Sequence, residues 1–108
     1  MNPALLGLVL LVSTANAAVA SATPPPPGAR LYSEKTCNAC HGPEGRKPQM
    51  PMYPKLAGQN AAYLEQQMRD IKSGTRSNGH SAAMKGVMHA VSDAEIRVLA
   101  EYLAQLKP

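Results

Sequence analysis

Large apolar side chains are scarce in the part of this chain that can form a folded domain. Residues 29–108 contain six Leu, two Ile, three Val and no Phe, so only eleven of these 80 residues have a large aliphatic or Phe side chain. That share lies below the roughly 20% under which a chain struggles to offset the entropy lost on folding. We therefore expect a non-protein apolar group to fill the middle of the domain.

The distribution of β-branched residues argues against a sheet. Residues 29–108 contain seven of them, which are scattered at Thr36, Ile71, Thr75, Val87, Val91, Ile96 and Val98. Strands are usually rich in these residue types, and several strands would need more of them. The sequence therefore predicts an all-α domain.

Helix signals are clear in two segments. Asn60 is placed to cap a helix that Gly74 ends, and Ser92 with Glu95 forms a capping box at the start of a second helix. Apolar residues recur along one face of each helix, at Ala61, Leu64, Met68 and Ile71 and at Ile96, Leu99, Leu103 and Leu106. A short helix is also expected around Leu31, and the proline- and glycine-rich segment 37–58 is expected to be mostly loop.

The first 28 residues are typical of export rather than of a fold. Residues 4–12 are small or apolar and include five Leu, and Ala-x-Ala cleavage sites follow within 15–22. We interpret 1–22 as an export signal peptide, 23–28 as a proline-rich spacer and 29–108 as the domain. No Lys or Arg precedes the apolar run, which leaves a retained anchor as the alternative. Export by a bacterium predicts an oxidising location, the periplasm, with no stable membrane insertion after cleavage.

Candidate chemistry is concentrated at Cys37-Asn38-Ala39-Cys40-His41, a C-x-x-C-H sequence. Two thiols at this spacing can each add to one vinyl group of a haem, and the adjacent His is then placed beneath the iron as an axial ligand. A porphyrin would also add the apolar surface that the core lacks. Two thioether bonds to it would cross-link the chain and so stabilise a domain of this size. The motif predicts one covalent haem c held by Cys37, Cys40 and His41.

Other uses of the two cysteines fit the sequence less well. A structural zinc site needs further Cys or His at finger-like spacing, whereas His80 and His89 are distant and nine residues apart. A thioredoxin-type redox motif follows a strand in a βαβ unit, and no such strand is predicted. A plain disulfide suits an exported protein, but it leaves His41 and the missing core unexplained.

Residue spacing alone leaves the second axial ligand of the iron open. Met68 lies on an apolar helix face and is interpreted as core, and Met50 and Met52 follow His41 too soon to reach the opposite haem face easily. Four candidates remain in a segment that we expect to be loop, namely His80, Met84, Met88 and His89. The same cluster is compatible with a copper site built from thioether and imidazole ligands.

Four blocks of residues between Ala29 and Lys107 form a recognisable pattern. They run from Cys37 to Gly45, from Tyr53 to Gln59, from Tyr63 to Arg76 and from Met84 to Leu103. Together they cover essentially the whole domain and are specific in combination. On these residues the chain resembles the class I c-type cytochromes, in particular the small monohaem c4 and c553 kinds. The resemblance implies a cytochrome c fold, with three to five helices around one covalently attached haem.

The resemblance also implies roles for two residues outside the C-x-x-C-H sequence. In that family the distal Met lies eight residues before the Ser that opens the C-terminal helix, which here is Met84. Met88 then lines the haem crevice without bonding the iron. The family's Pro-x-Leu-x-Gly segment places a proline carbonyl, here that of Pro54, against the second nitrogen of the proximal imidazole. An acceptor there would fix the tautomer of His41 and strengthen it as a ligand.

Iron with both axial positions filled has no open site for a substrate and can only change its oxidation state. We therefore expect an electron carrier rather than an enzyme. Its partners would be redox proteins, such as a membrane respiratory complex, an oxidase or a dehydrogenase flavoprotein, and not nucleic acid. An alternative is the haem c subunit of a flavocytochrome c sulfide dehydrogenase-type oxidoreductase, which 71–96 also resembles. A peroxidatic or ligand-binding haem protein would require that Met84 not bind iron.

The net charge of +4 adds one electrostatic expectation. Six basic residues lie in segments that would flank the haem, namely Arg46, Lys47, Lys55, Lys72, Arg76 and Lys85. They are expected either to form a basic rim that steers acidic partners or simply to keep the protein soluble.

Overall fold

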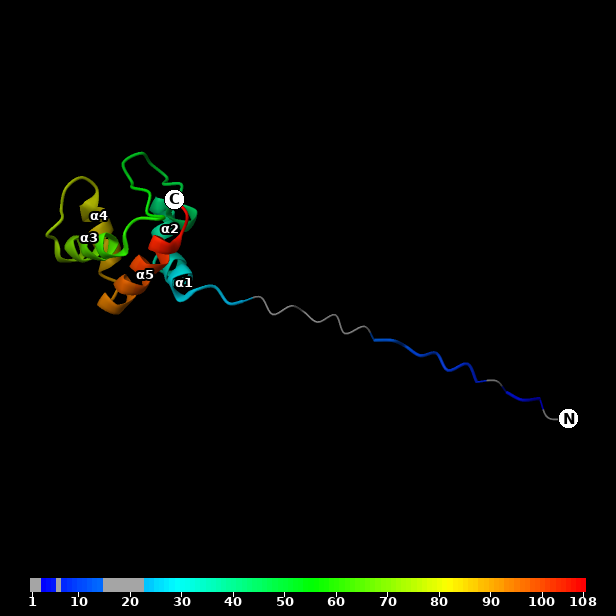
Figure 1. Ribbon diagram of the computed structural model, residues 1–108. Coiled ribbons are helices and arrows are strands. Elements are labelled where there is room, and N and C mark those ends of the chain that lie inside the picture. The colour runs from blue at the N-terminus through cyan, green and yellow to red at the C-terminus, as the bar shows by residue number, and fades with distance from the viewer. Residues whose placement is uncertain (1–2, 6, 15–22) are drawn as a thin grey trace.

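The computed structural model describes residues 3–5, 7–14 and 23–108. Within these ranges it contains helices and no strand, so the expected all-α fold is confirmed (Figure 1). The elements are α1 (Pro27–Glu34), α2 (Cys37–His41), a single 3₁₀ turn η1 (Pro43–Gly45), α3 (Ala61–Ser73), α4 (Ser81–Met88) and α5 (Asp93–Gln105).

Residues 23–26 lead away from the helices (Figure 1). Residues 3–5, 7–14 and 23–26 have no regular secondary structure and are exposed. In the part of the chain that the structure describes, no helix is long and apolar enough to cross a membrane. The Ala-x-Ala sites at 15–22 lie outside the described residues, so signal cleavage stays a prediction.

The first helix begins earlier than the sequence suggested. Pro27 and Gly28, which were expected to end the spacer, form the first turn of α1. Gly28 is buried so close to the side chain of Tyr102 on α5 that a Cβ at this position would collide with it. The absence of a side chain at Gly28 therefore allows α1 to approach α5 closely.

Side-chain caps set the starts of the two long helices as expected. The Asn60 side chain accepts a hydrogen bond from the Tyr63 backbone N–H at 3.0 Å at the start of α3. At the start of α5 the Ser92 hydroxyl accepts from the Glu95 N–H at 3.1 Å, and the Glu95 carboxylate accepts from the Ser92 N–H at 2.9 Å. Gly74 ends α3 in the left-handed conformation, with φ of 87°.

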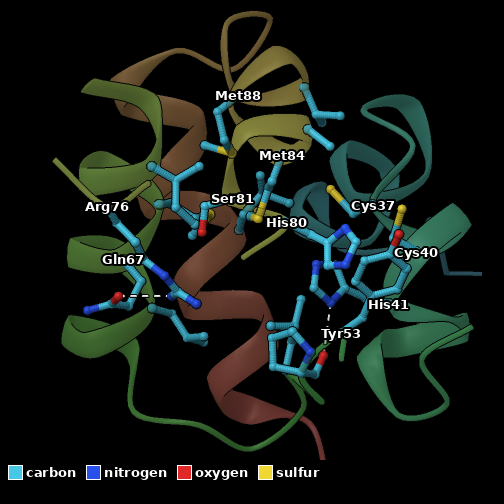
Figure 2. A pocket seen from close by; sticks show the side chains of 18 of the residues that line it. Cys37, Cys40, His41, Tyr53, Gln67, Arg76, His80, Ser81, Met84 and Met88 are labelled. Carbon is cyan, nitrogen blue, oxygen red and sulfur yellow. Dashed lines mark hydrogen bonds between the residues drawn. The ribbon is translucent and has the colours of Figure 1, made fainter. Parts of the chain in front are cut away.

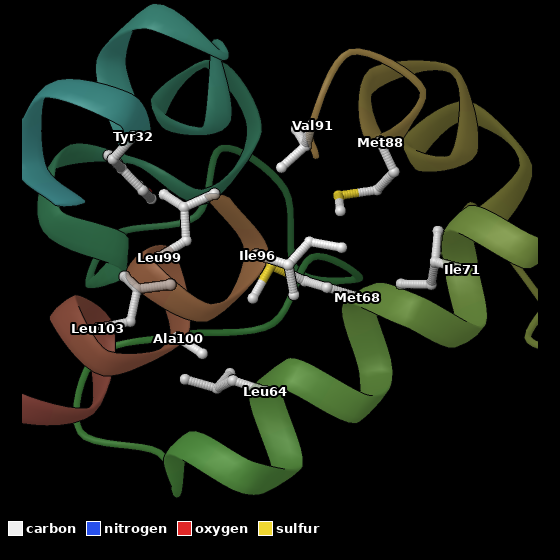
Figure 3. Close-up of a cluster of buried hydrophobic side chains, with 10 residues drawn as sticks. All are labelled: Tyr32, Leu64, Met68, Ile71, Met88, Val91, Ile96, Leu99, Ala100 and Leu103. Carbon is white, nitrogen blue, oxygen red and sulfur yellow. The ribbon is translucent and has the colours of Figure 1, made fainter. Parts of the chain in front are cut away.

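Helix α5 is central to the packing, because it contacts both α1 and α3. Figure 3 shows the buried side chains gathered between these helices, with Met88 and Val91 closing the cluster from the α4 side. Ile96, Leu99 and Val91 are the largest side chains that are fully buried. Met68 is part of this cluster, in agreement with its interpretation as a core residue.

The segment that holds the four candidate axial ligands is not the loop that the sequence suggested. Residues 81–88 form the helix α4, which packs against α3. Gly86 and Val87 lower the intrinsic helix propensity of this segment, so the helix depends on tertiary packing, which cannot be read from local sequence. Met84 and Met88 are four residues apart and so lie on the same face of α4.

The segment between η1 and α3 has little regular structure but is tied to the rest of the domain by main-chain hydrogen bonds. The Leu56 N–H donates to the Gly45 carbonyl at 2.8 Å, and the Gly58 N–H donates to the Leu103 carbonyl of α5 at 2.9 Å. The Arg46 side chain adds a 2.7 Å hydrogen bond from Nε to the Lys107 carbonyl. These bonds fix the position of the segment that carries Pro54.

Candidate haem site

One cavity of about 460 Å³ opens between α2, α3, α4 and the segment that precedes α3 (Figure 2). It brings together the five site residues that the sequence singled out, because Cys37, Cys40, His41, Pro54 and Met84 all line it. Its volume is in the range of ordinary cofactor and ligand sites. Most of the remaining lining is apolar, contributed by core residues that include Leu64, Met68, Ile71, Leu99 and Leu103.

The short helix α2 places three reactive side chains on the same side. Cys37, Cys40 and His41 are spaced i, i+3 and i+4, and these positions share one helix face. Thr36, which precedes the helix, has φ of 62°, and Gly42, which follows it, has φ of 77°. The chain therefore turns sharply at both ends of α2, which keeps the helix to little more than one turn.

His41 is buried and held in one orientation. Its Nδ1 lies 2.9 Å from the carbonyl oxygen of Pro54. A carbonyl can only accept, so Nδ1 carries the proton and Nε2 keeps a free lone pair. Burial lowers the pKa of His41 below its usual value, and the bond to Pro54 opposes this shift in part. A neutral imidazole with a free Nε2 is the form that binds a metal ion.

The two cysteine side chains differ in exposure. Cys37 is half-buried, and burial raises the pKa of its thiol to about 11. Cys40 is exposed at the edge of the cavity. In the ranges 3–5, 7–14 and 23–108, no group of three or more His, Cys, Asp or Glu side chains is placed to hold a metal ion.

The four candidates for the second iron ligand differ in their surroundings. Met84 is half-buried and points into the cavity (Figure 2), whereas Met88 is only 3% exposed and belongs to the core cluster as well as to the cavity wall. His80 also lines the cavity, with its ring 5.8 Å from that of Tyr53 between centroids. His89 does not line the cavity.

The cavity wall itself contains little basic charge. Of the six basic residues, only Arg76 lines it. Lys72 instead donates from Nζ to the Val91 carbonyl and lies 3.9 Å from the Asp93 carboxylate, on the α3–α5 side of the domain.

Sequence reasoning missed two polar residues of the cavity wall. Gln67 lies on the cavity side of α3, where its side chain meets that of Arg76. Its spacing from Leu64 and Ile71 places it on the apolar face of the helix, and a polar residue there is a usable signal. Tyr32 is buried, and its hydroxyl donates to the Gly42 carbonyl at 2.6 Å. That hydrogen bond links α1 to the turn after His41, a relation that has no local sequence signal.

The residues present fit a covalently bound haem. The donor set consists of two thiols at vinyl spacing and one neutral, oriented imidazole, followed on the facing helix by a thioether. The apolar walls suit a porphyrin. An all-α domain with a C-x-x-C-H motif in the wall of such a cavity has the architecture of a c-type cytochrome.

Comparisons with known proteins agree with this class. Residues 26–107 match the family model described as Cytochrome c, and the chain belongs to this family. A cytochrome c4 of Azotobacter vinelandii is 36% identical over 114 residues, which cover 100% of this chain and 52% of that protein. A protein named thiosulfate dehydrogenase electron acceptor from Stutzerimonas stutzeri is 41% identical over 70 residues, covering 65% of this chain and 32% of that protein.

A solved structure supports the same fold. The crystal structure of reduced recombinant cytochrome c4 from Pseudomonas stutzeri superposes with a TM-score of 0.65 and 33% sequence identity, over 74% of this chain and 46% of that chain. The chain spans about half the length of the cytochrome c4 relative from Azotobacter vinelandii, 52%.

Proposed function

We propose that this protein transfers electrons through one haem c, attached covalently by Cys37 and Cys40 and ligated by His41 and Met84. The observation that carries the proposal is a C-x-x-C-H helix that opens onto an apolar cavity, with the imidazole of His41 oriented by Pro54. When bound, the haem would supply a reversible one-electron change at its iron.

The residues of the chain prepare the site for that chemistry. The carbonyl of Pro54 keeps the proton of His41 on Nδ1, which leaves Nε2 for the iron. Core side chains such as Leu64, Met68 and Leu99 line the cavity and would shield a bound haem from water. Apolar surroundings and a thioether ligand both disfavour the more highly charged ferric state, so we expect a positive reduction potential.

Three observations support an exported carrier that meets redox proteins. The apolar run at 4–12, with its following Ala-x-Ala sites, is typical of export and supports the bacterial periplasm as the location. One relative is named as the electron acceptor of thiosulfate dehydrogenase, which supports a separate carrier rather than a fixed enzyme subunit. Exposed Met52, Tyr63 and Val87 at the cavity wall offer apolar contact area to a partner.

Covalent haem is tested by denaturation. Unfolded wild-type protein should retain one haem per chain by mass spectrometry, and the double variant Cys37→Ser, Cys40→Ser should lose it. Each single variant is the matched control, because one thioether bond should still hold the haem. Extraction of the haem from wild-type protein by acidified acetone would contradict the proposal.

The choice between a carrier and a subunit is tested on the native protein from the periplasm. A carrier should elute from gel filtration as the haem protein alone. Elution with a flavoprotein at fixed stoichiometry would instead identify a subunit of a flavocytochrome c sulfide dehydrogenase-type oxidoreductase and leave the haem ligation unaffected.

A further inference from the structure

His80 is the residue directly before α4, the helix that carries Met84. Its main-chain carbonyl accepts hydrogen bonds from the Ala83 N–H at 3.1 Å and from the Met84 N–H at 3.4 Å. Residues four apart along a helix have their Cβ atoms about 5–6 Å apart. Because His80 and Met84 both line the cavity, an imidazole and a thioether open onto it from the same end of α4.

The imidazole of His80 also lies near that of His41. The ring of Tyr53 is 5.8 Å from the His80 ring and 6.3 Å from the His41 ring between centroids, and Figure 2 shows these side chains grouped at the cavity. The cavity therefore contains two imidazoles, one from α2 and one from the residue before α4. Imidazole and thioether are both axial ligands that haem proteins use.

The side chain of His80 is not tied to another group. The His41 ring is hydrogen-bonded to Pro54, whereas in the part of the chain that the structure describes the ring nitrogens of His80 make no hydrogen bond or ion pair. His80 is exposed and follows Gly79, which has φ of 55°. A Cβ at Gly79 would meet no atom within 4 Å. This turn thus has open space around it, so that His80 can change position without disturbing the core.

We propose that His80 is a second iron-binding side chain, which replaces Met84 when the bond between its thioether and the iron breaks. This inference rests on the proposed function. The exchange is a ligand substitution without oxidation or reduction. The thioether leaves with its own lone pair, and an imidazole nitrogen of His80 donates a lone pair in its place.

The exchange has two consequences for the protein. A thioether ligand raises the reduction potential, so its replacement by imidazole should lower the potential. Both axial positions also stay filled, which keeps the iron closed to small ligands such as peroxide or cyanide. His80 therefore prevents the loss of Met84 from turning a carrier into a ligand-binding or peroxidatic haem protein.

The test is the ferric spectrum of haem-loaded Met84→Ala at one fixed pH near neutrality. This variant should lack the far-red sulfur band but stay low-spin, with the electron paramagnetic resonance spectrum of iron bound by two imidazoles. Addition of His80→Gln should convert it to high-spin iron. Because bound His80 blocks the site, cyanide should bind the double variant at least about tenfold more tightly than it binds Met84→Ala.

The matched control combines Met84→Ala with His89→Gln. His89 is exposed at the other end of α4 and does not line the cavity, so this double variant should keep the spectrum of two imidazoles. A far-red band retained in Met84→Ala would show that another methionine is the ligand and would overturn the inference. High-spin iron in Met84→Ala would also overturn it, as would a low-spin spectrum that His80→Gln does not change.

A second measurement avoids the loss of Met84, in case Met84→Ala fails to fold. In rising denaturant, the ferric wild-type protein should lose the far-red band while it is still low-spin, whereas His80→Gln should become high-spin as the band disappears. His89→Gln is the control and should follow the wild type. Identical behaviour of wild type and His80→Gln would overturn the inference and leave the proposed function standing. Wild-type protein without covalent haem would overturn the proposed function itself.

Discussion

The Nδ1–H of His41 donates a hydrogen bond to the carbonyl oxygen of Pro54 at 2.9 Å. The acceptor is a main-chain atom, so its place depends on the segment around it rather than on the proline ring. Hydrogen bonds at Leu56 and Gly58 anchor that segment to η1 and to α5. The orientation of the imidazole is thus set by the end of α5 as well as by the sequence next to His41.

A first prediction separates the carbonyl of Pro54 from its ring. Pro54→Ala keeps the carbonyl, so the His41 Nδ1 proton should remain visible by NMR, and the free energy of unfolding should fall by about 1 kcal/mol or less. Gly58→Ala should destabilise the protein more, because Gly58 has φ of 78° and a Cβ there would meet Pro108 at 2.6 Å. Equal effects of the two substitutions in thermal melts would contradict this account.

A second prediction distinguishes the two methionines of α4. Met84→Ala should abolish the far-red sulfur-to-ferric-iron absorption band with a small loss of stability, because Met84 is only half-buried. Met88→Ala should keep the band but lower the free energy of unfolding by about 2–5 kcal/mol, since Met88 is buried in the core. Met50→Ala, at an exposed position, is the control for both measurements. The reverse pattern would assign the iron ligand to Met88.

Features that depend on neighbouring residues could be predicted from the sequence. The caps at Asn60 and Ser92 are hydrogen bonds within one helical turn, so the residue types at fixed spacing were sufficient to place them. The C-x-x-C-H sequence is equally local, so residue types at fixed spacing are sufficient to identify its three side chains.

Features that depend on tertiary packing could not be predicted in this way. Helix α4 packs against α3 although Gly86 lowers its helix propensity, whereas the sequence alone suggested a loop here. Lys72 lies in a segment that was predicted to flank the haem, but its ammonium group binds the Val91 carbonyl and does not line the cavity. Only the fold shows that Arg76 alone among the basic residues lines the cavity.

A third prediction concerns the capping box of α5. Ser92→Ala should lower the free energy of unfolding by about 0.5–2 kcal/mol. The Ser92 backbone N–H, followed by its side chain and the charge of Lys35, holds the pKa of Glu95 below its usual value. A lowered pKa means that the stabilisation by Glu95 is present above the usual glutamate range and is lost as pH falls through the folded-state pKa.

Thermal melts between pH 2 and pH 7 test this pH dependence. The melting temperature of wild-type protein should fall more steeply on acidification than that of Glu95→Gln. Glu101→Gln, an exposed substitution on the same helix, is the control and should follow the wild-type curve. Parallel curves for wild type and Glu95→Gln would show that the cap does not depend on the charge.

A fourth prediction concerns Tyr32. Burial raises the pKa of its phenol from 10.0 to about 12. The folded protein therefore keeps the proton that the unfolded chain releases, and the stabilisation is full below pH 10 and is lost as pH rises through about 12. Tyr32→Phe should remove one of the two hydrogen bonds that the Gly42 carbonyl accepts, leaving the one from the Gly45 N–H, and should cost about 0.5–1.5 kcal/mol. Absorbance at the tyrosinate band should show one phenol fewer titrating late, whereas exposed Tyr63→Phe should not change that late phase.

The fifth prediction follows from the cavity and the scarce core together. Seven of the ten residues in the core cluster also line the cavity, namely Tyr32, Leu64, Met68, Ile71, Met88, Leu99 and Leu103. Without haem these side chains would face water in a cavity of about 460 Å³ that opens to solvent, and the stabilisation from burying their apolar area would be lost. The free energy of unfolding of a domain is only about 5–15 kcal/mol, so a small domain cannot easily lose the burial of most of its core. The domain should therefore depend on its haem for folding.

The variant Cys37→Ala, Cys40→Ala, His41→Ala tests this dependence. Without haem it should have little helical circular dichroism and no cooperative thermal transition, whereas the haem-loaded wild type should unfold cooperatively. The control is Met84→Ala, which keeps both thioether bonds and His41 and should remain folded because the porphyrin still fills the cavity. A cooperative transition in the triple variant would show that α1, α3 and α5 pack stably without haem. The stability of the domain would then come mainly from contacts between its helices.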